Sequence, residues 1–178
     1  MKLRNFVLMA GVLASIVVIK TSARADNILD KLGKPQAAVV RGGDVSAVIK
    51  PEVAKAAPGQ DIKVSADFTI ASGWHIYGKP ISTDYVPTTV TFDKQVVAQQ
   101  SIEFPKPEMM NFAALGQTLP VYKNKVHAGG DVKLRPDLKP GDYQLTGKVE
   151  FQECSDNICK IPQSLPFAIP ITVASSAH

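Results

Sequence analysis

The sequence has few cysteines, few aromatic residues and only one long apolar run. Its 178 residues include two cysteines and one tryptophan, and Phe, Trp and Tyr together make up 7%. Two cysteines allow a single intramolecular disulfide, which excludes a densely cross-linked small scaffold. The apolar run, residues 6–19, is shorter than the roughly 20 residues of a spanning helix. We therefore expect no membrane span in the mature chain.

The amino terminus is typical of a secretory signal. Lys2 and Arg4 precede the apolar run, and residues 23–25 (ARA) provide small residues where a signal peptidase reads. We expect residues 1–25 to be removed and the mature chain to begin at Asp26. An uncleaved amino-terminal anchor is the alternative. An exported chain folds in an oxidising compartment, where two thiols left to themselves end as a disulfide.

The positive charge belongs to the predicted signal. Four of the 20 basic residues and none of the 16 acidic ones lie in residues 1–25, which leaves 16 of each sign in the mature chain. A neutral mature protein lacks the basic excess that favours nucleic acid or anionic membrane surfaces. We expect neither as a partner.

The rest of the sequence predicts strands. Sustained helical periodicity is missing, and 13 prolines would interrupt long helices. Apolar and polar residues alternate over residues 62–70 and 143–152, as in half-buried strands. Shorter candidates are residues 86–92, 121–126, 131–134 and 167–173. We predict an all-β fold, an immunoglobulin-like β-sandwich, with a lead-in segment at 26–44 and one domain at 45–178. Residues 99–119 show no strand pattern, and a structureless connection of this length indicates either a functional loop or a wrong assignment.

The two cysteines lie five positions apart, around a turn-forming tetrapeptide, SDNI. Cys154 and Cys159 are therefore predicted to face each other across a β-hairpin, within reach of a disulfide. If the alternation of residues 143–151 continues, Cys154 points outward and is accessible. Such a short loop contributes only about 2 kcal/mol when closed, so opening it need not unfold the domain.

These residues alone leave three interpretations open. The pair could be a permanent structural disulfide, which is the commonest arrangement in exported proteins, or a dithiol that cycles between redox states. It could also bind zinc if His75 and His127 joined the two thiolates, although neither histidine lies at motif spacing from another ligand.

Several segments resemble one family. These are GWHIY, FPKPEMM, VYKNKV, PGDYQLTGKVEFQECSDNICKIP and the proline-rich last strand. In this order they resemble the amino-terminal periplasmic domain of the thiol:disulfide interchange protein DsbD, over about residues 45–173. The most specific part is residues 151–162, with an aromatic residue three positions before the first cysteine, an acidic turn, the second cysteine and a proline.

The resemblance implies a periplasmic thiol-disulfide exchange domain without a cofactor. Cys154 and Cys159 would receive electrons from a membrane-embedded donor and pass them to thioredoxin-like periplasmic proteins, of the disulfide isomerase or cytochrome c maturation type. Such a chain is an electron carrier, or a component of a protein-disulfide reductase. Because the given sequence has no later spanning segment and no CxxC, we expect the donor to be a separate polypeptide. The rival interpretation is a non-catalytic protein-binding or assembly sandwich with a structural disulfide.

The resemblance also suggests roles for neighbouring residues. A cap loop corresponds to residues 109–116, and Phe112 is expected to cover the disulfide, although residues 113–115 (AAL) depart from the family's acidic and aromatic pattern. His75 and Tyr77 are expected to line the site. We expect Cys159 to be the first nucleophile, because Lys160 could stabilise its thiolate while Glu153 and Asp156 oppose ionisation of Cys154.

Overall fold

The computed structural model describes residues 33–113 and 116–175, and within these ranges it contains strands but no helix. The predicted signal, residues 1–25, lies outside them. The described residues form thirteen strands: β1 (Ala38–Gly42), β2 (Val45–Pro51), β3 (Lys55–Ala56), β4 (Asp61–Ile70), β5 (His75–Tyr77), β6 (Thr89–Phe92), β7 (Val97–Glu103), β8 (Glu108–Phe112), β9 (Gln117–Tyr122), β10 (Lys125–Leu134), β11 (Gly141–Phe151), β12 (Glu153–Cys154) and β13 (Gln163–Val173).

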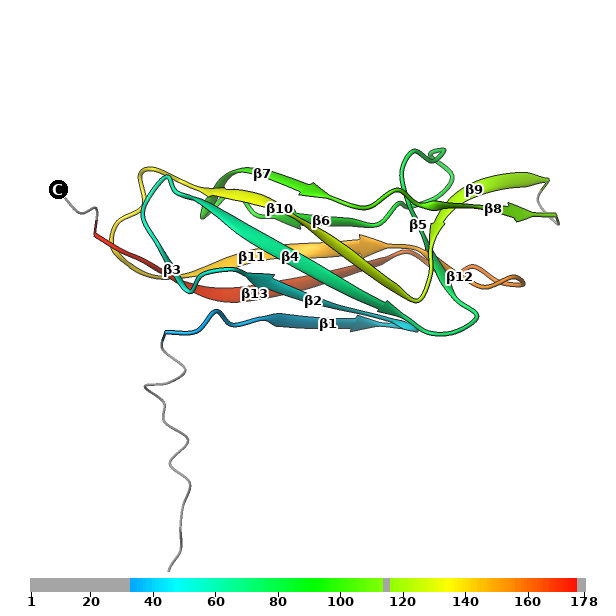
Figure 1. The fold of residues 1–178 in the computed structure, drawn as a ribbon, viewed down its shortest axis with the longest axis horizontal. Coiled ribbons are helices and arrows are strands. Elements are labelled where there is room, and N and C mark those ends of the chain that lie inside the picture. Colours follow the sequence, from blue (N-terminus) through cyan, green and yellow to red (C-terminus); the bar gives the residue numbers. More distant parts are fainter. Residues whose placement is uncertain (1–32, 114–115, 176–178) are drawn as a thin grey trace, which may run out of the picture.

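Two larger sheets form the body of the molecule. One has the order β1-β2-β4-β10-β7 and the other β3-β13-β11-β6 (Figure 1). All neighbours pair antiparallel except the short β3 with β13. The predicted fold class, an all-β immunoglobulin-like sandwich, is confirmed. The predicted lead-in, residues 26–44, includes β1, which pairs with β2 along its whole length.

The core lies between these sheets and follows the alternation seen in the sequence. In β4 every second side chain is buried, from Ile62 to Ile70, and its neighbours face solvent or are half-buried. In β11 the buried positions are Leu145, Gly147, Val149 and Phe151. Both sheets therefore bury one face and leave the other to water, as antiparallel sheets commonly do.

Of the two alternatives for residues 99–119, the wrong assignment holds, because this stretch is not a structureless loop. That stretch contains the end of β7, all of β8 and the start of β9. β7 and β8 are edge strands, each with one pairing partner, and most of their side chains are exposed. Because neither face of these strands is continuously buried, no alternation of polarity marks them in the sequence.

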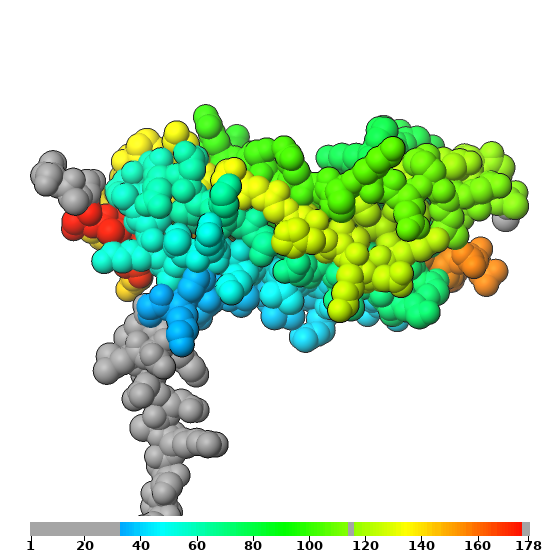
Figure 2. Space-filling model, viewed as in Figure 1, coloured from blue at the N-terminus to red at the C-terminus, as the bar shows by residue number. Residues whose placement is uncertain are grey.

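A third, smaller sheet lies at one end of the sandwich and positions the cysteines. Its order is β12-β5-β9-β8. Figure 1 shows β8, β9 and the hairpin that follows β12 projecting at the same end. In Figure 2 the orange atoms of that hairpin lie beside the yellow-green atoms of β8 and β9. In the described part of the chain, no helix is long and apolar enough to cross a membrane.

Candidate functional site

Cys154 and Cys159 form a disulfide across a tight hairpin. The sulfur atoms are 2.05 Å apart and the Cα atoms 4.0 Å apart. The amide of Ser155 donates to the carbonyl of Ile158 at 2.8 Å, on the side of the tip. On the other side, the Lys160 amide donates to the Glu153 carbonyl at 2.9 Å. The predicted pairing of the two cysteines across a hairpin is confirmed.

The two cysteines differ in their access to solvent. Cys154 is fully buried, at 0% exposure, whereas Cys159 is exposed. The prediction that Cys154 is accessible is therefore wrong. Both residues of β12 are buried, so both faces of this short strand are covered. β12 pairs with β5 instead of continuing the β11 ladder, and Cys154 packs with Tyr77, Phe112, Leu119 and Val121 in a cluster separate from the main core.

Tyr77 lies against the disulfide. Its hydroxyl donates to Cys154 Sγ at 3.2 Å and is 3.6 Å from Cys159 Sγ. Burial, with a contribution from the neighbouring Tyr85, raises the pKa of Tyr77 above its ordinary value of 10.0. The hydroxyl therefore keeps its proton at neutral pH. After reduction it can donate a hydrogen bond to a thiolate at Cys154, which stabilises the charged form.

His75 lies beside the same cysteine on β5, where it is the register partner of Cys154. The imidazole is 2% exposed, and its ring centre is 5.7 Å from that of Tyr77 and 5.0 Å from that of Phe112. Burial lowers the pKa of His75 below 6.5, and the charge of Lys123 lowers it further. His75 is thus a neutral ring that packs with Tyr77 and Phe112 beside Cys154.

Phe112, on β8, completes this group of aromatic residues. It is 9% exposed and packs in a cluster with Tyr77, Leu119, Val121 and Cys154. A pocket of about 440 Å³ opens between β8 and the hairpin, and both Phe112 and Cys159 line it. In the predicted cap loop, residues 109–116, the first four residues belong to β8. Residues 114 and 115 lie outside the described residues.

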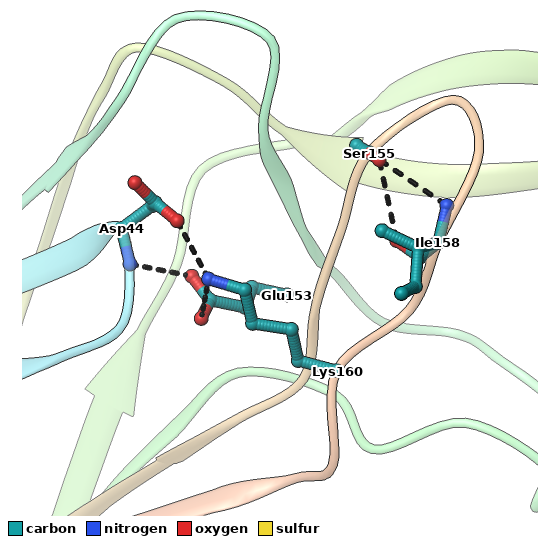
Figure 3. Close-up of polar contacts among 5 residues, drawn as sticks. All are labelled: Asp44, Glu153, Ser155, Ile158 and Lys160. Carbon is teal, nitrogen blue, oxygen red and sulfur yellow. Dashed lines mark hydrogen bonds and ion pairs between the residues drawn. The ribbon is translucent and has the colours of Figure 1, made fainter.

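Lys160 is held by two carboxylates. Its ammonium lies 2.6 Å from Asp44 Oδ2 and 3.0 Å from Glu153 Oε1 (Figure 3). Stabilisation of a Cys159 thiolate by Lys160 stays a prediction. Sequence reasoning missed Asp44 altogether, because this residue is 116 positions from Lys160. The one sequence signal was the Gly-Gly-Asp turn that ends in Asp44.

The structure does not bring His127 to the cysteines. His127 is on β10, with Nδ1 2.7 Å from Asp67 Oδ1, and both cysteine sulfurs are bonded to each other. Among the described residues, no group of three or more His, Cys, Asp or Glu side chains could hold a metal ion. The ligand set considered for zinc is therefore not assembled here.

The disulfide joins one exposed and one buried cysteine at the end of an immunoglobulin-like β-sandwich, beside His75, Tyr77 and Phe112. Residues 46–169 match the family model described as "Thiol:disulfide interchange protein DsbD, N-terminal", and the chain belongs to this family.

A solved structure shows the same fold. It is the N-terminal periplasmic domain of ScsB from Proteus mirabilis, with a TM-score of 0.53 and 18% sequence identity. The match covers 72% of this chain and 49% of that one, so this chain spans about half the length of its structural relative. No curated protein matches the sequence significantly.

The buried His75 predicts a pH-dependent stability. Because its pKa is lowered in the folded state, the unfolded chain takes up a proton first as the pH falls. The free energy of unfolding should be fully retained above about pH 6.5, the unfolded value, and decrease below it. His75→Phe should reduce this loss of unfolding free energy at acid pH. Urea unfolding at about pH 5 to 8 measures it.

The exposed His127 provides the matched control, since His127→Gln leaves the buried imidazole in place. This variant should lose stability below about pH 6.5 as the wild type does. An equal loss of unfolding free energy at acid pH in His75→Phe and the wild type would show that another group is responsible.

Proposed function

We propose that this chain is a periplasmic electron carrier that passes electrons through Cys154 and Cys159 to thioredoxin-like proteins. The observation that supports this most is the asymmetry of the disulfide, with Cys159 exposed and Cys154 buried beside the Tyr77 hydroxyl. A structural bridge needs no such difference between its sulfurs. An exchanging pair does, because one sulfur must meet the partner while the other waits to resolve the intermediate.

The exchange follows from this geometry. In the reduced domain the Cys159 thiolate attacks one sulfur of the acceptor disulfide, forming a mixed disulfide and releasing the acceptor's other sulfur as a thiolate. The Cys154 thiolate then attacks Cys159 Sγ. The intramolecular disulfide forms again, and the acceptor's second sulfur leaves as a thiolate. Two electrons have passed to the acceptor, whose thiolates take up protons from water.

Exposure is therefore a further reason to make Cys159 the first nucleophile. Only the exposed sulfur can approach a disulfide on another protein. The Tyr77 hydroxyl favours the thiolate form of Cys154 and so assists the resolving step. His75 and Phe112 line the site and shield the buried sulfur.

The surroundings of Cys159 suit a protein partner. Ile158 is 61% exposed and Ile161 is 79% exposed, one residue before and two after this cysteine. Met109 on β8 is 62% exposed. Exposed apolar side chains of this size often mark a surface that a protein covers. Thioredoxin-like acceptors present their own cysteines at the surface, and such a surface could dock here.

The remaining parts of the proposal come from the family and the amino terminus. Residues 1–25 would direct export and be removed, and the sandwich would work in the periplasm. The electrons would come from a membrane-embedded donor, and the acceptors would be disulfide isomerases or cytochrome c maturation proteins. The structural relative from Proteus mirabilis is itself described as a periplasmic domain.

The reduction potential tests this proposal. The purified chain is equilibrated in graded thiol-disulfide buffers, and free Cys154 and Cys159 are trapped by alkylation and counted by mass. We expect a midpoint between about −200 and −270 mV, the range of thioredoxin-type exchangers. A bridge that resists reduction below about −300 mV would instead identify a structural disulfide in a protein-binding sandwich.

A further inference from the structure

An ion-pair network around the buried Glu153 joins the two residues that flank the disulfide. Glu153 precedes Cys154 and Lys160 follows Cys159, and their charged atoms are 3.0 Å apart. Lys160 Nζ also reaches Asp44 Oδ2 at 2.6 Å, and the Asp44 amide donates to Glu153 Oε2 at 3.0 Å (Figure 3). We call Asp44, Glu153 and Lys160 the hairpin network.

The network contains a buried carboxylate and is therefore part of the packed structure. The Glu153 side chain is 0% exposed, and an unpaired carboxylate at such a site would be costly. Lys160 and the Asp44 amide compensate it, and the hydrogen bonds that Lys160 donates to Asp44 and Glu153 raise the pKa of Lys160 above 10.5. The ammonium also lies 3.9 Å from the ring centre of Trp74.

The turn before Asp44 is shaped around this carboxylate. Gly43 has a φ of 57°, a backbone conformation that residues other than glycine seldom adopt. A Cβ atom at Gly43 would lie 1.7 Å from Glu153 Oε1, so any larger residue would displace the carboxylate. The β1–β2 turn, β12 and the segment after Cys159 therefore meet at one charged group.

The position of the network matters most when the disulfide is open. With the S–S bond broken, the tip of the hairpin keeps the hydrogen bonds among Ser155, Asn157 and Ile158. At its base, the Glu153–Lys160 ion pair and the backbone bond between the same residues still join the two strands. That base is one residue from each sulfur.

We propose that the hairpin network positions Cys154 and Cys159 opposite each other in the reduced state, so that Cys154 resolves the mixed disulfide rapidly. This inference rests on the proposed exchange function and assigns Asp44, Glu153 and Lys160 as positioning residues. Holding two reacting groups in place raises their effective concentration and accelerates their reaction. In the resolving step the Cys154 thiolate attacks Cys159 Sγ, and the partner's sulfur leaves with the electron pair of the broken bond.

The test uses glutathione, which needs no protein acceptor. Lys160→Met removes the charge but keeps the length of the side chain. We expect the equilibrium between disulfide and dithiol to shift about tenfold towards the dithiol, equivalent to about 30 mV for this two-electron couple. Release of glutathione from the Cys159 mixed disulfide should slow by about tenfold. Lys160→Arg, which can hold both carboxylates, should restore both values.

A second readout separates position from charge. If Lys160 acted by stabilising a thiolate at Cys159, Lys160→Met would slow the alkylation of Cys159 in the reduced chain. The positioning role predicts unchanged alkylation together with slower release. Lys63→Met is the matched control, because it breaks an exposed ion pair with Asp131 on β4 and β10. It should leave all three values unchanged.

Trp74 gives an optical test of the same idea, since it is the only tryptophan of the chain and lies under the Lys160 ammonium. A network that persists after reduction predicts the same emission maximum in the disulfide and dithiol forms of the wild type. A large shift on reduction would show that the network opens with the bond and would overturn the inference.

Lys160→Met could fail to fold, because it leaves the Glu153 carboxylate buried and unpaired. The neutral double variant Glu153→Gln/Lys160→Met avoids that charge and should still show the slower release. Wild-type release in either folded variant would overturn the positioning role alone. A wild-type bridge that resists reduction would instead overturn the proposed exchange function, and this inference with it.

Discussion

We expect Cys159→Ala to abolish thiol-disulfide exchange with any protein disulfide, and Cys154→Ala to stall after the first step. Without Cys159, the only thiol left is fully buried and cannot approach a partner. Without Cys154, the exposed thiol still attacks, but nothing resolves the mixed disulfide. Mixing each variant with an oxidised thioredoxin-like domain and separating the products on a non-reducing gel distinguishes the two. Only Cys154→Ala should give a stable adduct.

Both variants should remain folded, so that a loss of exchange cannot be attributed to unfolding. The disulfide closes a short loop, so its loss costs about 2 kcal/mol, a small part of what holds a domain with a core of this size. Circular dichroism and urea unfolding check this. Unfolding at room temperature would favour a structural disulfide. A stable adduct formed by Cys159→Ala would reverse the assigned order of the two sulfurs.

The sequence predicts the body of the sandwich well because one physical signal governs it. Where a strand buries one face against the opposite sheet, as β4 and β11 do, its polarity alternates and the facing of each side chain can be read directly. The hairpin between the cysteines can also be predicted from local sequence, because the cysteines are five positions apart and enclose a turn-forming tetrapeptide.

The site could be predicted only in part, because its decisive features are not local. Gln152 breaks the β11 ladder, with Oε1 accepting from the Val86 amide and Nε2 donating to the Lys160 carbonyl. After the break Cys154 is covered by Tyr77, Phe112, Leu119 and Val121, and nothing in the sequence of the strand indicates this cover. The pairing of Asp44 with Lys160 joins residues that are 116 positions apart in the sequence. The edge strands β7 and β8 carry no alternation to detect.

One of these non-local features produces the asymmetry of the disulfide. β12 leaves the β11 ladder after Gln152, and its pairing with β5 places His75 and Tyr77 against Cys154. The hairpin carries Cys159 outward at the end of the molecule. A single change of strand partner thus accompanies the separation of the exposed cysteine from the buried one.

We expect Phe112→Ala to expose the buried sulfur and to destabilise the small sheet. The ring packs in the cluster that contains Tyr77 and Cys154, and removal of a buried phenylalanine side chain typically costs 3–5 kcal/mol, so we expect about 3 kcal/mol for this edge position. Reduction by glutathione should become several-fold faster. Attack should also lose its selectivity, because a small thiol could then reach Cys154 Sγ as well as Cys159 Sγ.

Mass spectrometry of the trapped glutathione adducts locates the sulfur that was attacked in the Phe112 variant. In the wild type the adduct should be on Cys159 alone, since this is the exposed cysteine. Met109→Ala is the matched control, because Met109 is on the same strand but 62% exposed, and it should keep the wild-type rate and selectivity. If Phe112→Ala is reduced at the wild-type rate and only at Cys159, the ring does not shield the disulfide. Protection of Cys154 would then come from Tyr77 and the burial of β12 alone.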